Sequence, residues 1–391
     1  MSSQRSWDSG LSVIYLASCA LHDILPDKAT VDAMDVEPVY IQAKRHKMQS
    51  VTYMALSSVE DNPAEKYPLW YRDHTQSMRM LFSYALEREK VQQFFEKNGI
   101  WYLPLKGIVL QNLYPKFGMR QMVDNDYLVD AEKCELIRDR MVADGYDVYM
   151  YGRASHDVYH KLPYGNFEMH KTLCTESLSD RFARYYSNVK ERLIKDDTGE
   201  YGYHFTDEDR YIYFIVHAYR HYAITGGTGI RTLMDAFIYD TRCGKTMDRA
   251  YIDRELKHLE ILDFEISLRK LAIKIFDREN CRPDYCNTDL TEEEKGLLDY
   301  FVGSGCFGMA SQTFKQTLEG YADEDGKVNA KSKFKYYLNR LFPTGLYIKE
   351  NYPTLYKHKY LIPFFWIYRI VTKIFTRTKY ILKEINVIRK Q

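Results

Sequence analysis

The segment MVDNDYLVD at residues 122–130 decides the fold of the central region. Its side chains are expected to alternate between the two faces of a β-strand. Asp124 and Asp126 then share one face, with Cβ atoms roughly 7 Å apart because each residue rises about 3.3 Å. Two carboxylates this close repel each other and are costly to bury. A divalent cation compensates such charge, and oxygen ligands of this kind suit Mg²⁺; a solvated edge strand or a turn is the alternative from spacing alone.

The residues around this segment predict a small α/β unit at 100–175. Helices are expected from 108 and at 131–144, where apolar residues recur at helical spacing. Short apolar or alternating runs predict further strands at 100–105, 146–150, 156–162 and 166–173.

Helical periodicity flanks this unit on both sides. Helices are expected at 11–21, 51–59 and 73–97 before it, and from about 206, at 230–239, 262–276 and 292–301 after it. The fold class is therefore α+β, a small mixed-sheet core flanked by N- and C-terminal helical regions. We divide the chain into an N-terminal helical region (1–99), the α/β core (100–175), a helical substrate or acceptor domain (176–330) and a basic amphipathic C-terminal segment (331–391).

The composition is that of a globular protein, with 391 residues of which 45% are hydrophobic and 28% charged. It excludes a disordered, collagen-like or disulfide-scaffold protein. Seven cysteines spread along the chain predict reduced thiols and a cytoplasmic location. Cys281 and Cys286 are close in sequence, but no second pair completes a zinc site. The apolar run at 11–21 is too short to span a bilayer and lacks the basic flank of an export signal, so we expect a buried helix.

The net charge of +1 conceals an asymmetry along the chain. Residues 331–391 carry 14 Lys and Arg against Glu350 and Glu384, a net charge of +12, which leaves −11 on the rest. Between 360 and 388, bulky apolar residues are interleaved with basic ones. Docking of this segment on the protein's own acidic body is favoured; peripheral binding to an anionic membrane surface and binding to a nucleic-acid backbone remain open.

A third carboxylate lies in NFEMHKT at 166–172, where Glu168 shares a strand face with His170. If this strand neighbours the Asp pair, three carboxylates can hold two metal ions, which clamp the attacking and leaving oxygens of a phosphoryl displacement. Taken alone, Glu168 and His170 indicate no more than a polar strand face.

Two basic positions upstream are candidates for binding phosphate oxygens. Lys106-Gly107, between a predicted strand and a predicted helix, offers a cation and a permissive backbone. Arg120, just before the Asp pair, is the second candidate, and a surface arginine is its alternative. The Gly-x4-Gly-Lys-Ser/Thr loop of other phosphate-binding enzymes is absent.

The run LKGIVLQNLYPKFGMRQMVDNDYLV at 105–129 resembles the uncharacterised nucleotidyltransferase family of the DNA polymerase β-like superfamily. In that family a Leu-Lys-Gly turn is followed by Tyr-Pro, an Arg and an Asp-x-Asp strand. FEMH at 167–170 is similar to its third-carboxylate strand. Later segments are similar as well, namely VHAYRHY at 216–222, IRTLMD at 230–235 and LFP at 341–343, so the resemblance covers roughly residues 50–345.

The resemblance implies an enzyme that moves NMP from an NTP, ATP included, to a hydroxyl of a small molecule, sugar or protein, using Mg²⁺ or Mn²⁺. Asp124 and Asp126 would ligate both metal ions. Glu168 would complete the second metal site and help to deprotonate the acceptor hydroxyl. The triphosphate would be held by Lys106, Gly107 and Arg120. Acceptor-binding or supporting roles would fall to His170, His217, His221, Arg231 and Asp235.

One departure from the wider superfamily concerns the phosphate loop. There a Gly-Ser pair lies shortly before the carboxylates, whereas here Gly107 is followed by Ile108 and 16 residues separate it from Asp124. We therefore expect Lys106 to take over the role of that Ser. The alternative functions are a non-catalytic nucleotide- or partner-binding module on the same scaffold, and a template-independent RNA nucleotidyltransferase.

The pair His217 and His221 has its own alternative. Spacing of i and i+4 on a helix can bind zinc, but the His-Glu-x-x-His form is missing because Ala218 follows the first histidine. Packing or acceptor contact is therefore favoured.

Overall fold

The computed structural model describes residues 3–389 except 154, 164, 177–178, 224–226, 285–288, 307, 309–313, 315–316, 319–320 and 322–326. Cys286 lies outside these residues, and the other six cysteines are free thiols. Zinc binding at Cys281 and Cys286 therefore stays untested.

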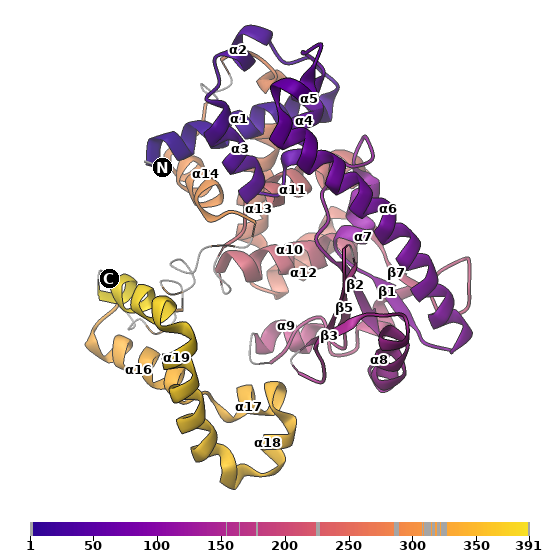
Figure 1. Ribbon diagram of the computed structural model, residues 1–391, viewed down its shortest axis with the longest axis vertical. Helices are drawn as coiled ribbons and strands as arrows, with labels where there is room; N and C mark the ends of the chain where they lie inside the picture. Colours follow the sequence, from indigo (N-terminus) through magenta and orange to yellow (C-terminus); the bar gives the residue numbers. More distant parts are fainter. Residues whose placement is uncertain are drawn as a thin grey trace.

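A mixed five-stranded sheet forms the centre of the α/β unit, as predicted (Figure 1). Its strand order is β1-β2-β5-β4-β3, and β2 and β5 run parallel while the other neighbours are antiparallel. The strands are β1 (Tyr102–Pro104), β2 (Asn125–Val129), β3 (Asp147–Met150), β4 (His156–Lys161) and β5 (Gly165–His170). This arrangement confirms the α+β class and places β2, the Asp-x-Asp strand, inside the sheet with all five residues buried.

The two faces of the sheet belong to different hydrophobic cores. On one face, Tyr127, Phe167 and Met169 pack against apolar side chains of α6 (Pro68–Lys97) and α8 (Cys134–Ala143). Leu103 and Leu128 point to the opposite face and join the core of the helical body. Because side chains alternate along a strand, Asp126 and Glu168 lie on this second face, toward the helices that follow the α/β unit.

The helical body combines segments from both ends of the chain. Figure 1 shows the indigo helices near the N-terminus beside the helices that follow the sheet. One continuous core contains Tyr15 and Val51 from the first group and Leu271 and Phe301 from the second. The first group comprises α1 (Ser3–His22), α2 (Lys28–Asp32), α3 (Val36–Arg45), α4 (Gln49–Ser57) and α5 (Pro63–Lys66); the second comprises α10 (Asp207–Ala223), α11 (Ile230–Cys243), α12 (Arg249–His258), α13 (Leu262–Phe276) and α14 (Glu292–Ser304). The predicted boundaries at 99 and 176 stay predictions.

Several elements differ from the sequence expectations. Helix α6 begins at Pro68 rather than 73, because Pro is tolerated in the first turn of a helix. Strand β2 begins at Asn125, so Asp124 precedes the strand. Short elements without a strong period were not predicted: β6 (Leu193–Lys195), β7 (Tyr203–Phe205), α9 (Asp180–Tyr185), η1 (Gln111–Leu113), η2 (Ala131–Lys133), η3 (Val189–Arg192) and η4 (Arg278–Asn280).

The C-terminal segment forms a separate lobe (Figure 1). It contains α16 (Ala330–Leu341), α17 (Gly345–Asn351), α18 (Pro353–Lys357), η6 (Lys359–Leu361) and α19 (Ile362–Arg389). Glu384 of α19 accepts hydrogen bonds from Tyr336 at 2.5 Å and from Arg340 at 3.1 Å, which joins α19 to α16. Within the part of the chain that the structure describes, no helix combines the length and apolarity required to cross a bilayer.

Candidate active site

The three predicted carboxylates meet on one face of the sheet, around the start of β2. β2 and β5 are adjacent parallel strands, and their register places Asp126 opposite Glu168. Asp124 lies directly before β2, two residues from Asp126. One oxygen of each carboxylate lies within 4.8 Å of the others. The structure therefore brings together residues that the sequence placed on two separate segments.

Asp126 is the most buried of the three, with 1% of its surface exposed. Its Oδ1 accepts hydrogen bonds from Lys106 Nζ at 2.6 Å and His170 Nε2 at 2.9 Å. Its Oδ2 is buried and has no hydrogen-bond partner in the part of the chain that the structure describes. Burial alone would raise the pKa of Asp126, but Lys106 and His170 outweigh this effect and hold that pKa well below its ordinary value.

Asp124 carries the opposite shift. Burial, and the negative charges of Asp126 and Glu168, raise the pKa of Asp124 to about 7 against the opposing charge of Lys106. The single ammonium of Lys106 thus leaves the three carboxylates short of positive charge. A cation fits here for two reasons. Among the described residues the buried Asp126 Oδ2 has no hydrogen-bond partner, and the pKa of Asp124 lies well above that of an ordinary carboxyl group.

The turn before α7 (Gly107–Leu110) holds the Lys106 side chain over these carboxylates. Lys106 has φ 47° and ψ −117°, a conformation that favours glycine. Strain of this kind costs on the order of 1–3 kcal/mol and is kept where surrounding structure or function requires it. At Gly107, an added Cβ would lie 2.8 Å from Arg120 Nη1, so glycine allows Arg120 to approach the turn.

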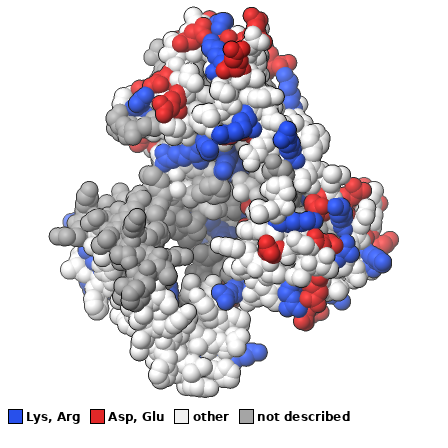
Figure 2. All heavy atoms as spheres, in the orientation of Figure 1, with Lys and Arg blue, Asp and Glu red and all other residues white. Residues whose placement is uncertain are grey.

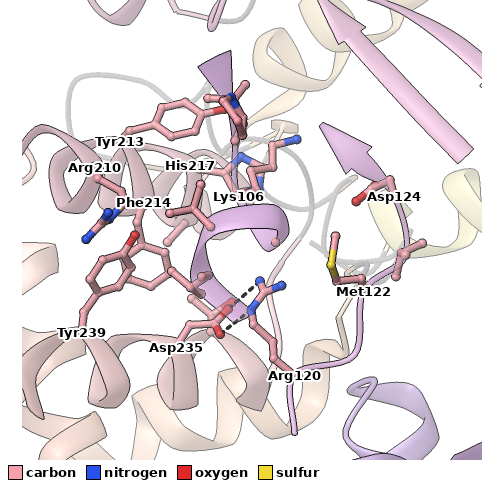
Figure 3. A pocket seen from close by; sticks show the side chains of 18 of the residues that line it. Lys106, Arg120, Met122, Asp124, Arg210, Tyr213, Phe214, His217, Asp235 and Tyr239 are labelled. Atoms are coloured by element: carbon pink, nitrogen blue, oxygen red, sulfur yellow. Dashed lines mark hydrogen bonds and ion pairs between the residues drawn. The ribbon is translucent and has the colours of Figure 1, made fainter. Parts of the chain in front are cut away.

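Arg120 is held by a buried ion pair with Asp235 of α11 (Figure 3). Its Nε donates to Asp235 Oδ1 at 2.8 Å, and its Nη2 donates to Oδ2 at 3.0 Å. Tyr114 also donates to Asp235 Oδ1, at 2.5 Å. The pair links the segment before β2 to the helical body, and Nη1 is the part of Arg120 that faces Gly107.

These groups lie around a cavity of about 510 Å³ between this face of the sheet and helices α10 and α11 (Figure 3). This volume is within the range of small-molecule sites. Asp126 and His170 are not among its lining residues and lie against Lys106 and Glu168. All the other predicted site residues line it, namely Lys106, Gly107, Arg120, Asp124, Glu168, His217, His221, Arg231 and Asp235.

Residues 32–277 match the family described as an uncharacterised nucleotidyltransferase. The chain belongs to this nucleotidyltransferase family. The match contains every predicted site residue and ends before the LFP triplet at 341–343 that we associated with the family. Neither a curated protein nor a solved structure matches the chain.

The His217–His221 pair lies on the α10 side of the cavity. The two rings are 4.5 Å apart in an edge-on arrangement. Burial lowers the pKa of both histidines, that of His221 to about 4, so both are neutral at pH 7. Neither belongs to a group of described residues with the geometry to hold a metal ion. Packing or acceptor contact at these two histidines stays a prediction.

Sequence reasoning missed several groups at this candidate site. His156 begins β4 directly opposite His170, and its Nε2 lies 3.8 Å from Glu168 Oε2. Arg210 and the aromatic ring of Tyr213 line the cavity from α10 (Figure 3). The sequence shows His156 at the start of the predicted strand at 156–162. Its position beside Glu168 and His170 depends on the register between two strands, which no local sequence pattern specifies.

Proposed function

We propose that this chain transfers a nucleotidyl group from an NTP to a hydroxyl acceptor and releases pyrophosphate. One observation carries the proposal: Asp124, Asp126 and Glu168 converge beside the cavity, and a buried oxygen of Asp126 has no hydrogen-bond partner among the described residues. Such oxygen donors would hold Mg²⁺ or Mn²⁺. When bound, these ions supply positive charge to the phosphate oxygens and to the attacking and leaving oxygens.

In this proposal, the positive groups opposite the carboxylates bind the triphosphate. The Lys106 ammonium is 2.6 Å from Asp126 and reaches the cavity, where it would bind phosphate oxygens once a cation shares the charge of Asp126. Gly107 leaves the backbone open on that side, and Arg120 Nη1 lies close to it. Asp235 accepts hydrogen bonds from Nε and Nη2 of Arg120, so Nη1 is the nitrogen of the guanidinium group that faces this turn.

The transfer itself exchanges one phosphorus–oxygen bond for another. The acceptor oxygen forms a bond to the α-phosphorus, and the bond from that phosphorus to the oxygen bridging the β-phosphate breaks. The acceptor hydroxyl proton goes to Glu168, which is partly exposed and lines the cavity. We propose that the acceptor, a small molecule, a sugar or a protein side chain, binds on the α10 and α11 side, near His217, His221 and Arg231.

The first test is calorimetric titration of the full chain with each of the four NTPs, with and without Mg²⁺. We expect Mg²⁺-dependent binding of at least one NTP, weakened at least tenfold in Asp124→Asn because that carboxylate is a proposed ligand. Asp196→Asn is the matched control, since Asp196 lines the same cavity but bonds to His204 instead, at 2.6 Å. Failure of a folded wild type to bind any NTP would refute the proposal.

Turnover separates catalysis from binding. Pyrophosphate release with an acceptor, or NMP attached to the chain itself, would support the transferase. NTP binding without either, across sugars, small alcohols, RNA ends and proteins, would favour the non-catalytic binding module. Extension of RNA ends alone would favour the template-independent RNA nucleotidyltransferase.

A further inference from the structure

A second set of metal-ligand atoms lies beside the three carboxylates. His156 is the first residue of β4 and stands directly opposite His170, the last residue of β5. Their rings are 4.8 Å apart. Glu168, two residues before His170 on the same strand, points to the same face. One atom of each of these three side chains lies within 4.8 Å of the other two.

The distances within this set resemble metal coordination more than hydrogen bonding. Glu168 Oε2 is 3.6 Å from His170 Nε2 and 3.8 Å from His156 Nε2. A normal N–H···O bond spans about 2.7–3.2 Å, so neither contact is one. Two ligand atoms that each lie about 2.1 Å from a tetrahedral ion are about 3.4 Å apart. The two distances from Glu168 therefore need only a small contraction to enclose a cation, and the ligand atoms of the two histidines lie within 4.8 Å of each other.

The surroundings leave the ligand atoms of Glu168 and His156 available. In the described part of the chain, no residue donates a hydrogen bond to the Glu168 carboxylate. Ser155 Oγ lies 3.0 Å from His156 Nδ1, which orients the ring with Nε2 toward Glu168. The side chains of His156 and Glu168 are 25% and 21% exposed, so an ion can enter from solvent. His170 Nε2 donates to Asp126 Oδ1 at 2.9 Å, so it would exchange this hydrogen bond for the ion and release the proton, which connects this set to the carboxylates.

We propose that His156, Glu168 and His170 form a second cation subsite that takes a divalent transition metal ion, Mn²⁺ or Zn²⁺, in preference to Mg²⁺. Imidazole nitrogen suits these ions, whereas Mg²⁺ prefers oxygen ligands and water. Glu168 is shared with the three-carboxylate cluster. The centre thus combines an oxygen subsite with a nitrogen-containing one. The inference deepens the proposed function and rests on it only for the role of the second ion.

Pulsed electron paramagnetic resonance on the Mn²⁺-loaded full chain, without nucleotide, tests this subsite. We expect coupling of Mn²⁺ to imidazole nitrogen, and a loss of Mn²⁺ affinity of about tenfold or more in His156→Gln, because even supporting groups of metal sites contribute this much. His160→Gln is the matched control, because His160 lies on the same strand and stacks on Tyr149 instead. Asp124→Asn should keep the nitrogen coupling.

Two outcomes would overturn the inference: Mn²⁺ bound with oxygen ligands only, or equal Mn²⁺ affinity in His156→Gln and wild type. Either result combined with intact Mg²⁺-dependent NTP binding would leave the proposed function standing. Nitrogen coupling in a chain that binds no NTP would support the subsite and refute the proposed function.

An independent observation concerns the C-terminal lobe. On α19, Phe364, Ile367, Tyr368 and Val371 are 47–68% exposed and follow one another at spacings of three, one and three residues. This spacing places them on one face of the helix. The face shown in Figure 2 has few charged side chains over the described part of this lobe. Other exposed apolar side chains of the lobe are Phe334, Leu338 and Leu341 of α16 and Tyr360 of η6.

We propose that this face binds the surface of an anionic membrane. Monomers rarely leave large apolar patches in water, and an apolar helix face with aromatic rings beside basic residues is typical of interfacial binding. Residues 331–391 supply the complementary charge, +12. A nucleic acid would use that charge but would leave the apolar face uncovered, so the membrane is favoured.

Flotation of the full chain with vesicles tests the proposal. We expect binding to phosphatidylglycerol-containing vesicles that exceeds binding to pure phosphatidylcholine and falls with salt. Phe364→Ser/Ile367→Ser should weaken it about tenfold or more, because two large side chains no longer enter the interface. Leu86→Ser is the control, since Leu86 is 63% exposed on α6. Absence of flotation would overturn the proposal. It would also be overturned if Phe364→Ser/Ile367→Ser left vesicle binding unchanged but abolished a dimer or a complex with RNA.

Discussion

Replacement of Asp235 by Ala should destabilise the helical body strongly. The Arg120 and Asp235 side chains are 9% and 6% exposed, and two hydrogen bonds of 2.8 and 3.0 Å join them. Removing one partner leaves a buried charge without compensation, which typically costs about 3–5 kcal/mol. The loss should exceed that of an ordinary hydrogen bond because Tyr114 also loses its acceptor.

The magnitude can be measured by a double-mutant cycle. Urea denaturation would give the free energy of unfolding for Asp235→Ala, Arg120→Ala and the double variant. We expect the double variant to lose less than the sum of the single losses, because it removes both charges. Glu135→Ala is the matched control: Glu135 pairs with Arg138 at 3.2 Å, but its side chain is 76% exposed, so the loss should stay below about 1 kcal/mol.

Two results would refute this reasoning. One is a loss below about 1 kcal/mol in Asp235→Ala, which would mean that Arg120 finds water or another partner. The other is strict additivity in the double variant, which would mean that the two side chains do not interact in solution. A weakened NTP affinity in Asp235→Asn with little change in stability would instead make Asp235 a positioning residue for Arg120 Nη1.

Three further predictions concern single groups. Lys106→Gly should be more stable than Lys106→Ala by about 1 kcal/mol in denaturation experiments, because residue 106 has φ 47°, whereas both variants should bind NTP equally poorly. The pKa of Asp124 is raised to about 7 in the metal-free chain, so Mg²⁺ binding should release close to one proton per chain at pH 6 and only a small fraction of a proton at pH 8. Calorimetry in buffers of different ionisation enthalpy measures this release, and no release at pH 6 would contradict the prediction. Burial lowers the pKa of His46 from 6.5 to about 3, so between these pH values the unfolded chain binds a proton at His46 that the folded chain does not. The contribution of His46 to the free energy of unfolding should therefore be constant above pH 6.5 and fall by about 1.4 kcal/mol per pH unit below it. His46→Gln should reduce that slope.

The sequence predicted most of the long elements because their periods are strong. The helices at 73–97 and 262–276 show apolar residues at three-and-four spacing, and the structure contains α6 and α13 there. It did not predict the three-residue strands β6 and β7, which are too short to show a period. The strand at 122–130 was predicted with the correct faces, yet its order in the sheet depends on contacts that no local pattern records.

In the candidate site, too, local spacing predicted some residues, whereas tertiary packing alone brings the others together. Asp124 and Asp126 could be paired from their spacing, and Glu168 followed from a second strand. By contrast, Arg120 and Asp235 are 115 residues apart, so their ion pair is a product of tertiary packing. The sequence therefore suggested Arg120 as a triphosphate ligand and Asp235 as a supporting residue independently of each other. The structure shows that the two side chains form one bidentate ion pair. His156 was missed for the same reason, since only the register of β4 and β5 places it beside Glu168.

The position of Lys106 indicates how cation and nucleotide binding would be coupled at this site. Its ammonium is the closest positive charge to Asp126 and donates to Oδ1, while Oδ2 has no hydrogen-bond partner among the residues that the structure describes. A cation bound at Oδ2 would take over part of that neutralisation and would weaken the attraction between Asp126 and Lys106. The ammonium would then be free to bind an anion, and a triphosphate would provide one. Since coupling between two binding sites is reciprocal, the nucleotide must strengthen cation binding by the same factor. Lys106 keeps a backbone conformation that favours glycine. Such strain is consistent with a role in which its ammonium would exchange between Asp126 and the triphosphate.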